Sequence, residues 1–162
     1  MILVALGVNL PSPVHGGPLE TLEAALQALD AAGLRVAARS AWYETAPVPL
    51  SDQPWYVNGA ARVESVLDPA ELLKQLHEIE TAFGRVRSTP NAPRVLDLDL
   101  LAHGVVVSTG WPVLPHPRLH ERAFVLQPLM DVAPDWRHPV LGLDLPAMLA
   151  GIAPGQTTRR LD

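Results

Sequence analysis

Hydrophobic and polar positions repeat along this chain with two periods, and each period predicts one type of element. Runs in which apolar residues follow one another or alternate with polar ones predict strands at residues 2–9, 34–43, 56–66, 95–101 and 105–107. Apolar stripes at helical spacing, most of them bounded by proline or glycine, predict helices at residues 18–32, 68–83, 121–130 and 146–152.

The order of the main elements is β-α-β-β-α-β, followed by a C-terminal extension. This order is typical of the split βαβ, or ferredoxin-like, arrangement of the α+β class. Both helices are then expected on one face of an antiparallel sheet. A chain of 162 residues corresponds to one domain by length, so we expect residues 1–162 to form a single domain. The fold by itself indicates no function.

Two aspartates, Asp97 and Asp99, interrupt the apolar run APRVLDLDLL. Side chains two apart on a strand share a face, so Leu96, Leu98 and Leu100 point into a core and both carboxylates point away, about 7 Å apart. Neighbouring like charges oppose each other's ionisation unless water or a cation lies over them. The pair is therefore either a solvated strand face or a site for one or two Mg²⁺ ions, which prefer carboxylate and phosphate oxygens.

Composition narrows the class of protein. The formal net charge of −5 argues against non-specific binding to nucleic acid, which requires a basic face. The chain has no cysteine, which excludes disulfides and thiolate metal sites. We find no signal peptide and no apolar run long enough for a membrane span, so we expect a soluble cytoplasmic protein without membrane or nucleic-acid partners.

Two basic clusters flank the aspartates. The upstream cluster, in GRVRSTPNAPR, contains Arg85, Arg87 and Arg94. The downstream cluster, in LPHPRLHERAF, contains His116, Arg118, His120 and Arg122. Guanidinium groups pair bidentately with phosphates, so arginines beside a metal site suit a nucleoside triphosphate. The alternatives are surface salt bridges for the upstream cluster and a surface loop that leads into a helix for the downstream one.

The proline-rich stretch TAPVPLSDQPWYVN, residues 45–58, ends in Trp55, Tyr56 and Asn58. Aromatic faces stack on flat rings, and a side-chain amide can recognise a donor–acceptor edge. This stretch is therefore a candidate wall for a flat heterocycle. The alternative is that Tyr56 belongs to the core and Asn58 caps a local turn.

Taken together, these stretches resemble the 6-hydroxymethyl-7,8-dihydropterin pyrophosphokinases of folate biosynthesis. The resemblance is carried by LGVNL, YETAPV, DQPWYVN, IETAFGRVR, APRVLDLDLL, LPHPRLHERAFVLQPLMDVAP and HPVLG, in that order. It implies a diphosphotransferase that moves the terminal pyrophosphoryl group of ATP to the pterin's hydroxymethyl oxygen and releases AMP. ATP and the pterin would be its partners, and we expect a monomer.

The resemblance also implies residue roles. Asp97 and Asp99 would hold two Mg²⁺ ions and, with Arg85 and Arg94, act in catalysis. The residues expected to contact ATP are Arg85, Arg87, Arg94, Leu100 through its backbone, His116, Arg122 and His77. The residues expected at the pterin are Thr45, Ala46, Val48, Tyr56, Asn58 and Phe124, with Phe124 stacked on the ring.

The chain departs from the family pattern at three places. The loop at residues 88–92 is one residue short and lacks the tryptophan and lysine often found there. His77 stands where a glutamine commonly contacts the nucleotide, and Pro117 stands where an aromatic residue is common. Two other functions stay open, a two-metal nucleotidyltransferase and a non-catalytic ferredoxin-like module that binds a small ligand.

Overall fold

The computed structural model describes residues 1–8, 10–12, 14–46, 55–84 and 95–161. These residues form a six-stranded antiparallel sheet in the order β5-β1-β4-β3-β6, with β2 paired to β4. The strands are β1 (Ile2–Val8), β2 (Arg35–Arg39), β3 (Tyr43–Thr45), β4 (Tyr56–Glu64), β5 (Asp97–His103) and β6 (Thr158–Arg160). The predicted α+β class with an antiparallel sheet is confirmed.

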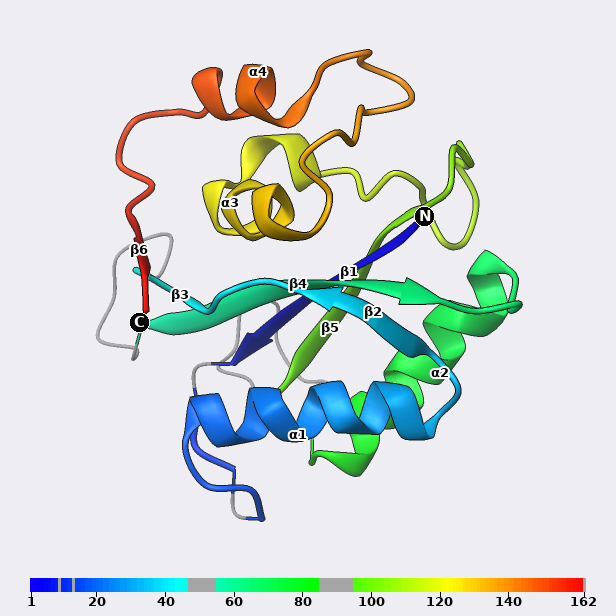
Figure 1. Ribbon diagram of the computed structural model, residues 1–162, viewed down its shortest axis with the longest axis vertical. Helices are drawn as coiled ribbons and strands as arrows, with labels where there is room; N and C mark the ends of the chain where they lie inside the picture. Colours follow the sequence, from blue (N-terminus) through cyan, green and yellow to red (C-terminus); the bar gives the residue numbers. More distant parts are fainter. Residues whose placement is uncertain (9, 13, 47–54, 85–94, 162) are drawn as a thin grey trace.

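Helices cover both faces of this sheet (Figure 1). The helices α1 (Pro18–Ala31) and α2 (Pro69–Ala82) cover one face, as predicted, and we call it the α1/α2 face. The 3₁₀ turn η1 (Leu119–Glu121) and the helices α3 (Ala123–Val132) and α4 (Leu145–Ala150) belong to the C-terminal extension and cover the opposite, α3/α4 face. No helix in the described part of the chain is both long enough and apolar enough to cross a membrane.

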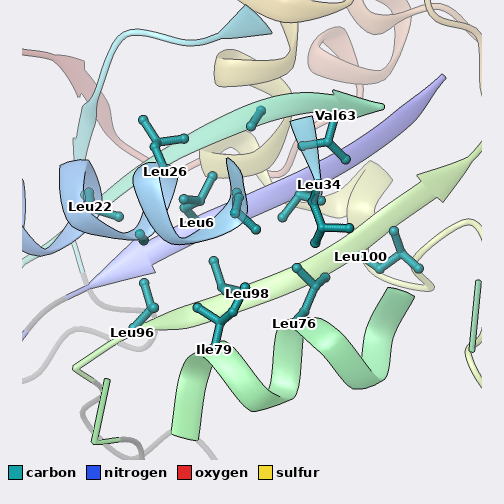
Figure 2. Close-up of a cluster of buried hydrophobic side chains, with 14 of the residues drawn as sticks. Leu6, Leu22, Leu26, Leu34, Val63, Leu76, Ile79, Leu96, Leu98 and Leu100 are labelled. Atoms are coloured by element: carbon teal, nitrogen blue, oxygen red, sulfur yellow. The ribbon is translucent and has the colours of Figure 1, made fainter. Parts of the chain in front are cut away.

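The α1/α2 face carries the larger apolar core (Figure 2). Leu22, Leu26 and Leu76 project from the two helices toward Leu6 and Leu98 on the sheet. Fully burying an aliphatic side chain of this size contributes about 1.5–3 kcal/mol, so this layer, with the larger set of buried residues, is a major source of the stability of the fold. It also holds β5 in register, because the leucines of that strand are part of the core.

The ends of α2 follow the local chemistry that the sequence indicates. The side chain of Asp68 accepts a hydrogen bond from the Glu71 amide at 2.8 Å and caps the first turn. Pro69 occupies the first helical position, where its missing N–H removes no helical bond. Gly84, with φ of 91°, follows the last turn in a conformation that favours glycine.

Two predicted strands are corrected by the structure. The stretch at residues 34–43 forms β2 and β3 instead of one strand, because they pair with different halves of β4. Between them, the Ser40 hydroxyl accepts a hydrogen bond from the Ala60 amide at 2.8 Å. Residues 105–107 form no strand, because these valines are exposed and pair with no described strand, so their β propensity lacks a partner.

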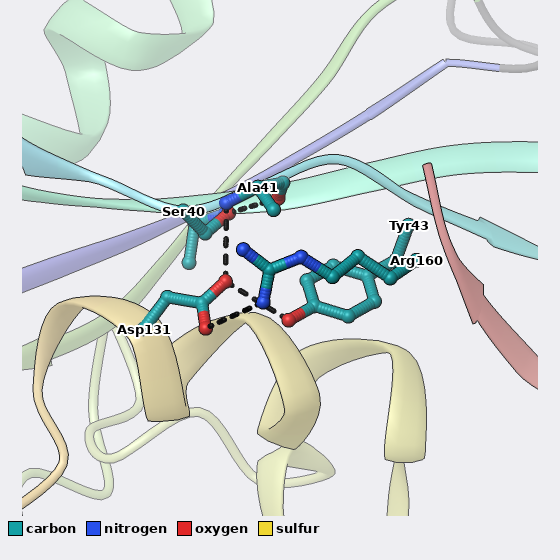
Figure 3. Close-up of polar contacts among 6 residues, drawn as sticks. Ser40, Ala41, Tyr43, Asp131 and Arg160 are labelled. Atoms are coloured by element: carbon teal, nitrogen blue, oxygen red, sulfur yellow. Dashed lines mark hydrogen bonds and ion pairs between the residues drawn. The ribbon is translucent and has the colours of Figure 1, made fainter. Parts of the chain in front are cut away.

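The C-terminal extension returns to the sheet, which the sequence did not predict. Strand β6 pairs with β3, and the Leu161 amide donates to the Trp42 carbonyl at 2.8 Å. Asp131 on α3 joins these segments, since its carboxylate accepts bonds from the Ala41 amide at 3.1 Å and the Tyr43 hydroxyl at 2.9 Å (Figure 3). The same carboxylate pairs with Arg160 at 3.8 Å. Helix α3, β3 and β6 are therefore tied at one point.

Candidate active site

A cavity of about 630 Å³ opens between the α3/α4 face of the sheet and the C-terminal extension. Its floor comes from β1, β3, β4 and β5, and its other walls come from η1, α3 and the segment after α4. Eight of the residues predicted from the sequence line it, namely Thr45, Ala46, Tyr56, Asn58, Asp97, Asp99, Arg122 and Phe124. The sheet and the extension thus bring together residues that are separated by up to 79 positions, from Thr45 to Phe124.

The carboxylates of Asp97 and Asp99 occupy the part of this cavity floored by β5. Leu98 and Leu100 point to the opposite face and are 1% and 4% exposed. Small residues lie opposite both aspartates on β1, where Gly7 pairs with Asp97 and Ala5 with Asp99. This register leaves space above the two carboxylates for a ligand or a cation.

The Leu98 amide, between the two aspartates, is held from the other side of the sheet. It donates a hydrogen bond of 2.7 Å to the carboxylate of Glu80 on α2. Glu80 is 1% exposed and lies within the apolar stripe of its helix. A carboxylate buried in this way is costly unless it is well bonded, so Glu80 serves to fix the strand that carries Asp97 and Asp99.

The amide of Asn58 has a defined orientation. Its Nδ2 donates to Thr45 Oγ1 at 2.8 Å, and both residues are almost fully buried. A Cβ added at Gly7 would lie 2.8 Å from Asn58 Oδ1, so any larger residue there would have to displace this amide. The bond to Thr45 therefore determines the orientation of the Asn58 amide, with Nδ2 toward Thr45 and Oδ1 toward Gly7, which leaves space for it.

Tyr56, Arg122 and Phe124 line the cavity together with Asn58. The guanidinium carbon of Arg122 lies 5.5 Å from the centroid of the Phe124 ring. A cation over an aromatic face is attracted by the ring quadrupole. The guanidinium therefore lies over one face of the Phe124 ring, and the pair brings a cation and a flat apolar group to the cavity.

His116 is a neutral imidazole within electrostatic range of Asp97. Burial, together with the cations Arg122 and Arg118, lowers its pKa to about 4 against the opposing effect of Asp97. Its Nδ1 accepts a bond from the Arg118 amide at 3.2 Å, which leaves the proton on Nε2. At neutral pH His116 is therefore a hydrogen-bond donor without a charge.

The other predicted residues do not line this cavity in the described structure. The Leu100 side chain packs in the α1/α2 core, His116 contributes no lining atoms, and the ring centroid of His77 on α2 lies 6.4 Å from that of Trp111. The predicted residues outside the described part of the chain are Val48, Arg85, Arg87 and Arg94.

The sequence interpretation missed several residues of the site. Gly151, Ile152, Ala153 and Gln156, which we call the C-terminal wall, line the cavity. Arg118, His120 and Glu121 line it as well, although Arg118 and His120 were noted as basic residues. Glu80 carried a sequence signal, a charged residue at a buried helical position, whereas the C-terminal wall carried none.

Comparison with known proteins gives the following matches. A family model described as 7,8-dihydro-6-hydroxymethylpterin-pyrophosphokinase (HPPK) matches residues 3–134. The 2-amino-4-hydroxy-6-hydroxymethyldihydropteridine pyrophosphokinase of Pseudomonas aeruginosa is 42% identical over 151 residues, 92% of this chain and 90% of that protein. The protein of the same name from Methylorubrum extorquens is 49% identical over 104 residues, 64% of this chain and 66% of that protein.

A longer relative and a solved structure are similar as well. The Folic acid synthesis protein fol1 of Pneumocystis carinii is 35% identical over 145 residues, so this chain spans only 19% of that protein's length. A Plasmodium falciparum HPPK-DHPS triple mutant superposes with a TM-score of 0.72 over 93% of this chain and 44% of that chain. Its sequence identity is 13%, so this likeness supports the fold alone.

Proposed function

This chain belongs to the 7,8-dihydro-6-hydroxymethylpterin-pyrophosphokinase family, and we propose that it transfers pyrophosphate from ATP to 6-hydroxymethyl-7,8-dihydropterin in folate biosynthesis. The family resemblance expected from the sequence is confirmed. In the proposed reaction the hydroxymethyl oxygen attacks the β-phosphorus of ATP in line, and AMP leaves. The names of the relatives support this assignment of an ATP-dependent diphosphotransferase.

One observation carries the proposal: a single cavity is lined by two carboxylates, a buried amide of defined orientation and two aromatic residues. The carboxylates suit the polyphosphate and its metal. The amide and the rings suit a flat heterocycle with a donor–acceptor edge. Transfer of a phosphoryl-type group depends mainly on positioning and electrostatic stabilisation, which this arrangement provides without a covalent nucleophile.

The carboxylate pair fits Mg²⁺. In the described part of the chain, no group of three or more histidine, aspartate or glutamate side chains is placed to hold a metal. Mg²⁺ is usually bound through one or two carboxylates together with waters and substrate phosphates, so Asp97 and Asp99 suffice once ATP is present. When bound, the metal would neutralise charge on the phosphates.

The pterin would lie against the Asn58 amide and the Phe124 ring. The bond to Thr45 fixes the Asn58 amide, so this amide would present one defined edge to the pterin. Tyr56 and Ala46 line the same cavity as the two carboxylates, and the hydroxymethyl group of the pterin would point toward those carboxylates. Val48, outside the described residues, is proposed to complete this wall.

ATP would extend from the carboxylates toward α2. Arg122, which lines the cavity, and the neutral His116 are proposed to donate to phosphate oxygens. The rings of His77 and Trp111 lie 6.4 Å apart, and we propose that His77 and the backbone of Leu100 contact the nucleotide. Arg85, Arg87 and Arg94 are proposed to contact the phosphates, with Arg85 and Arg94 contributing to catalysis.

The other predictions stay predictions. They are that residues 1–162 act as one domain, that the protein is a monomer, that it works in the cytoplasm and that two Mg²⁺ ions take part. The rival functions make different predictions, because a nucleotidyltransferase would release pyrophosphate from ATP. A binding module would retain its ligand in EDTA without turning it over.

The test is a product assay with ATP, Mg²⁺ and 6-hydroxymethyl-7,8-dihydropterin. We expect AMP and the pterin diphosphate, both absent when the pterin is omitted or EDTA is added. Release of ADP or pyrophosphate would overturn the proposed reaction. Pterin binding unchanged by EDTA, with no nucleotide product, would favour the binding module.

A further inference from the structure

The C-terminal wall of the cavity lies outside the part of the chain that the family model matches. That model covers residues 3–134, whereas Gly151, Ile152, Ala153 and Gln156 line the cavity. The wall is held at both ends. On one side Ile152 packs with α4 against the core of the α3/α4 face, and on the other β6 pairs with β3. The C-terminal wall is therefore held in a defined position along the cavity.

Within this wall, the side chain of Gln156 makes two hydrogen bonds that bracket one residue. Its Oε1 accepts from the Ala123 amide at 2.9 Å, and its Nε2 donates to the Glu121 carbonyl at 2.8 Å. The residue between those two backbone groups is Arg122. Both ends of one side-chain amide are thus used on the turn that presents Arg122 and Phe124 to the cavity.

This arrangement answers a local need of α3. The first amides of a helix have no partner within the helix and are usually capped by a serine, threonine, aspartate or asparagine just before it. Here the cap position is Arg122, whose side chain makes no capping bond and lies over the Phe124 ring. Gln156, 33 residues later in the chain, supplies the acceptor for the Ala123 amide.

We propose that Gln156 is a positioning residue for the reaction, acting through the turn at Glu121–Ala123 to hold Arg122 and Phe124 in place. The inference rests on the proposed function, in which Arg122 contacts phosphate and Phe124 stacks on the pterin. Gln156 sets the direction in which the chain enters α3, and hence where the arginine and the ring lie relative to Asn58 and the aspartates. The C-terminal wall thereby contributes to pterin affinity.

The test compares Gln156→Met with Thr157→Met in the full chain. Methionine is similar in length to glutamine but lacks the amide, and Thr157 is the exposed neighbour of Gln156. We measure the hydrogen exchange of the Ala123 amide by NMR, pterin affinity in the presence of an ATP analogue with a methylene bridge between the α- and β-phosphates, and kcat and KM.

We expect Gln156→Met to speed exchange at Ala123 and to weaken pterin affinity roughly tenfold, as the loss of two ordinary hydrogen bonds allows. Thr157→Met should match the wild type. Gln156→Glu keeps an acceptor for the Ala123 amide, so this amide should stay protected from hydrogen exchange. This variant provides the test if Gln156→Met fails to fold.

Unchanged Ala123 exchange in Gln156→Met, or faster exchange with unchanged pterin affinity and unchanged kcat and KM, would overturn the proposal. Failure of the proposed function is a different outcome, because the wild type itself would then release no AMP. The exchange measurement does not depend on turnover. It therefore reports on the Gln156 contacts in either case.

Discussion

The two faces of strand β5 have opposite surroundings: one is packed in a core and the other borders the cavity. Leu98 and Leu100 lie in the core of the α1/α2 face, which is closely packed, whereas Asp97 and Asp99 line the hollow part of the α3/α4 face. The backbone is shared, so the packed face sets the position of the groups on the hollow one. A site of two like charges can therefore be held in place without contacts that would fill it.

The strongest way to sharpen this contrast is to change the hollow face alone. Asp97→Ala removes a proposed metal ligand but no core packing, so we expect turnover to be abolished while the melting temperature stays close to that of the wild type. Asp135→Ala, at an exposed aspartate away from the cavity, is the matched control. Wild-type turnover in Asp97→Ala would refute the metal assignment.

The adjacent residue should show the opposite behaviour. Leu98→Ala leaves a space in the packed core, and we expect a loss of about 2–5 kcal/mol in the free energy of unfolding, measured by urea denaturation. Leu141→Ala, at a leucine 44% exposed, should change stability far less. The molecules of Leu98→Ala that remain folded should still release AMP. An inactive but fully stable Leu98→Ala variant would contradict the view that the core face of β5 supports stability and the cavity face supports activity.

Glu80 links the two faces and should affect both. Glu80→Leu leaves the buried Leu98 amide without this acceptor, and we expect a loss of about 1–3 kcal/mol in stability together with a higher Mg²⁺ requirement for turnover. Glu80→Gln keeps an acceptor oxygen, so its stability and Mg²⁺ requirement should lie between those of the wild type and of Glu80→Leu. Glu78→Leu, at an exposed residue nearby, is the control. Wild-type Mg²⁺ dependence in Glu80→Leu would argue that the carboxylate only fills space.

The smallest expected effect is the pH dependence of stability that arises from His138, in the C-terminal extension. Burial, and secondarily His120, lowers the pKa of His138, whose Nδ1 accepts bonds from the Val140 and Leu141 amides. The unfolded chain therefore takes up a proton at higher pH than the folded one. Stability from this group is present above pH 6.5, its ordinary pKa, and is lost as the pH falls toward the lowered value.

Thermal melting from pH 7.5 to pH 5 checks this effect. The melting temperature of the wild type should fall more over this range than that of His138→Asn, in which the amide oxygen accepts without titrating. Parallel curves for the two proteins would show that His138 does not contribute to the pH dependence.

Much of the packed face could be predicted from the sequence, because local patterns determine it. The leucines of α2, the Asp68 cap and the alternation at Asp97 and Asp99 each depend on residues a few positions apart. The same alternation predicted that both carboxylates share one face. The apolar runs at residues 34–43 and 105–107 were misassigned, because strand formation depends on partners that propensity does not specify.

The hollow face could be predicted only in part. The resemblance indicated Asn58, Tyr56 and Phe124, and the structure brings them to one cavity. It did not indicate Gln156, whose role depends on two backbone groups 33 and 35 residues away. Contacts of this kind leave no periodic trace in a sequence, since a single polar residue in a loop looks the same with or without a partner.

The pairing of β3 with β6 has a consequence for the order of folding. It joins residues far apart along the chain, as in the contact of Arg159 with Glu44, which are 115 positions apart. The buried residues of the leucine core all lie between Ile2 and Leu114, whereas the cavity also needs Gly151–Gln156, which are synthesised later. We therefore expect a newly synthesised chain to acquire its leucine core early and its substrate cavity late, after residues 151–160 have been made.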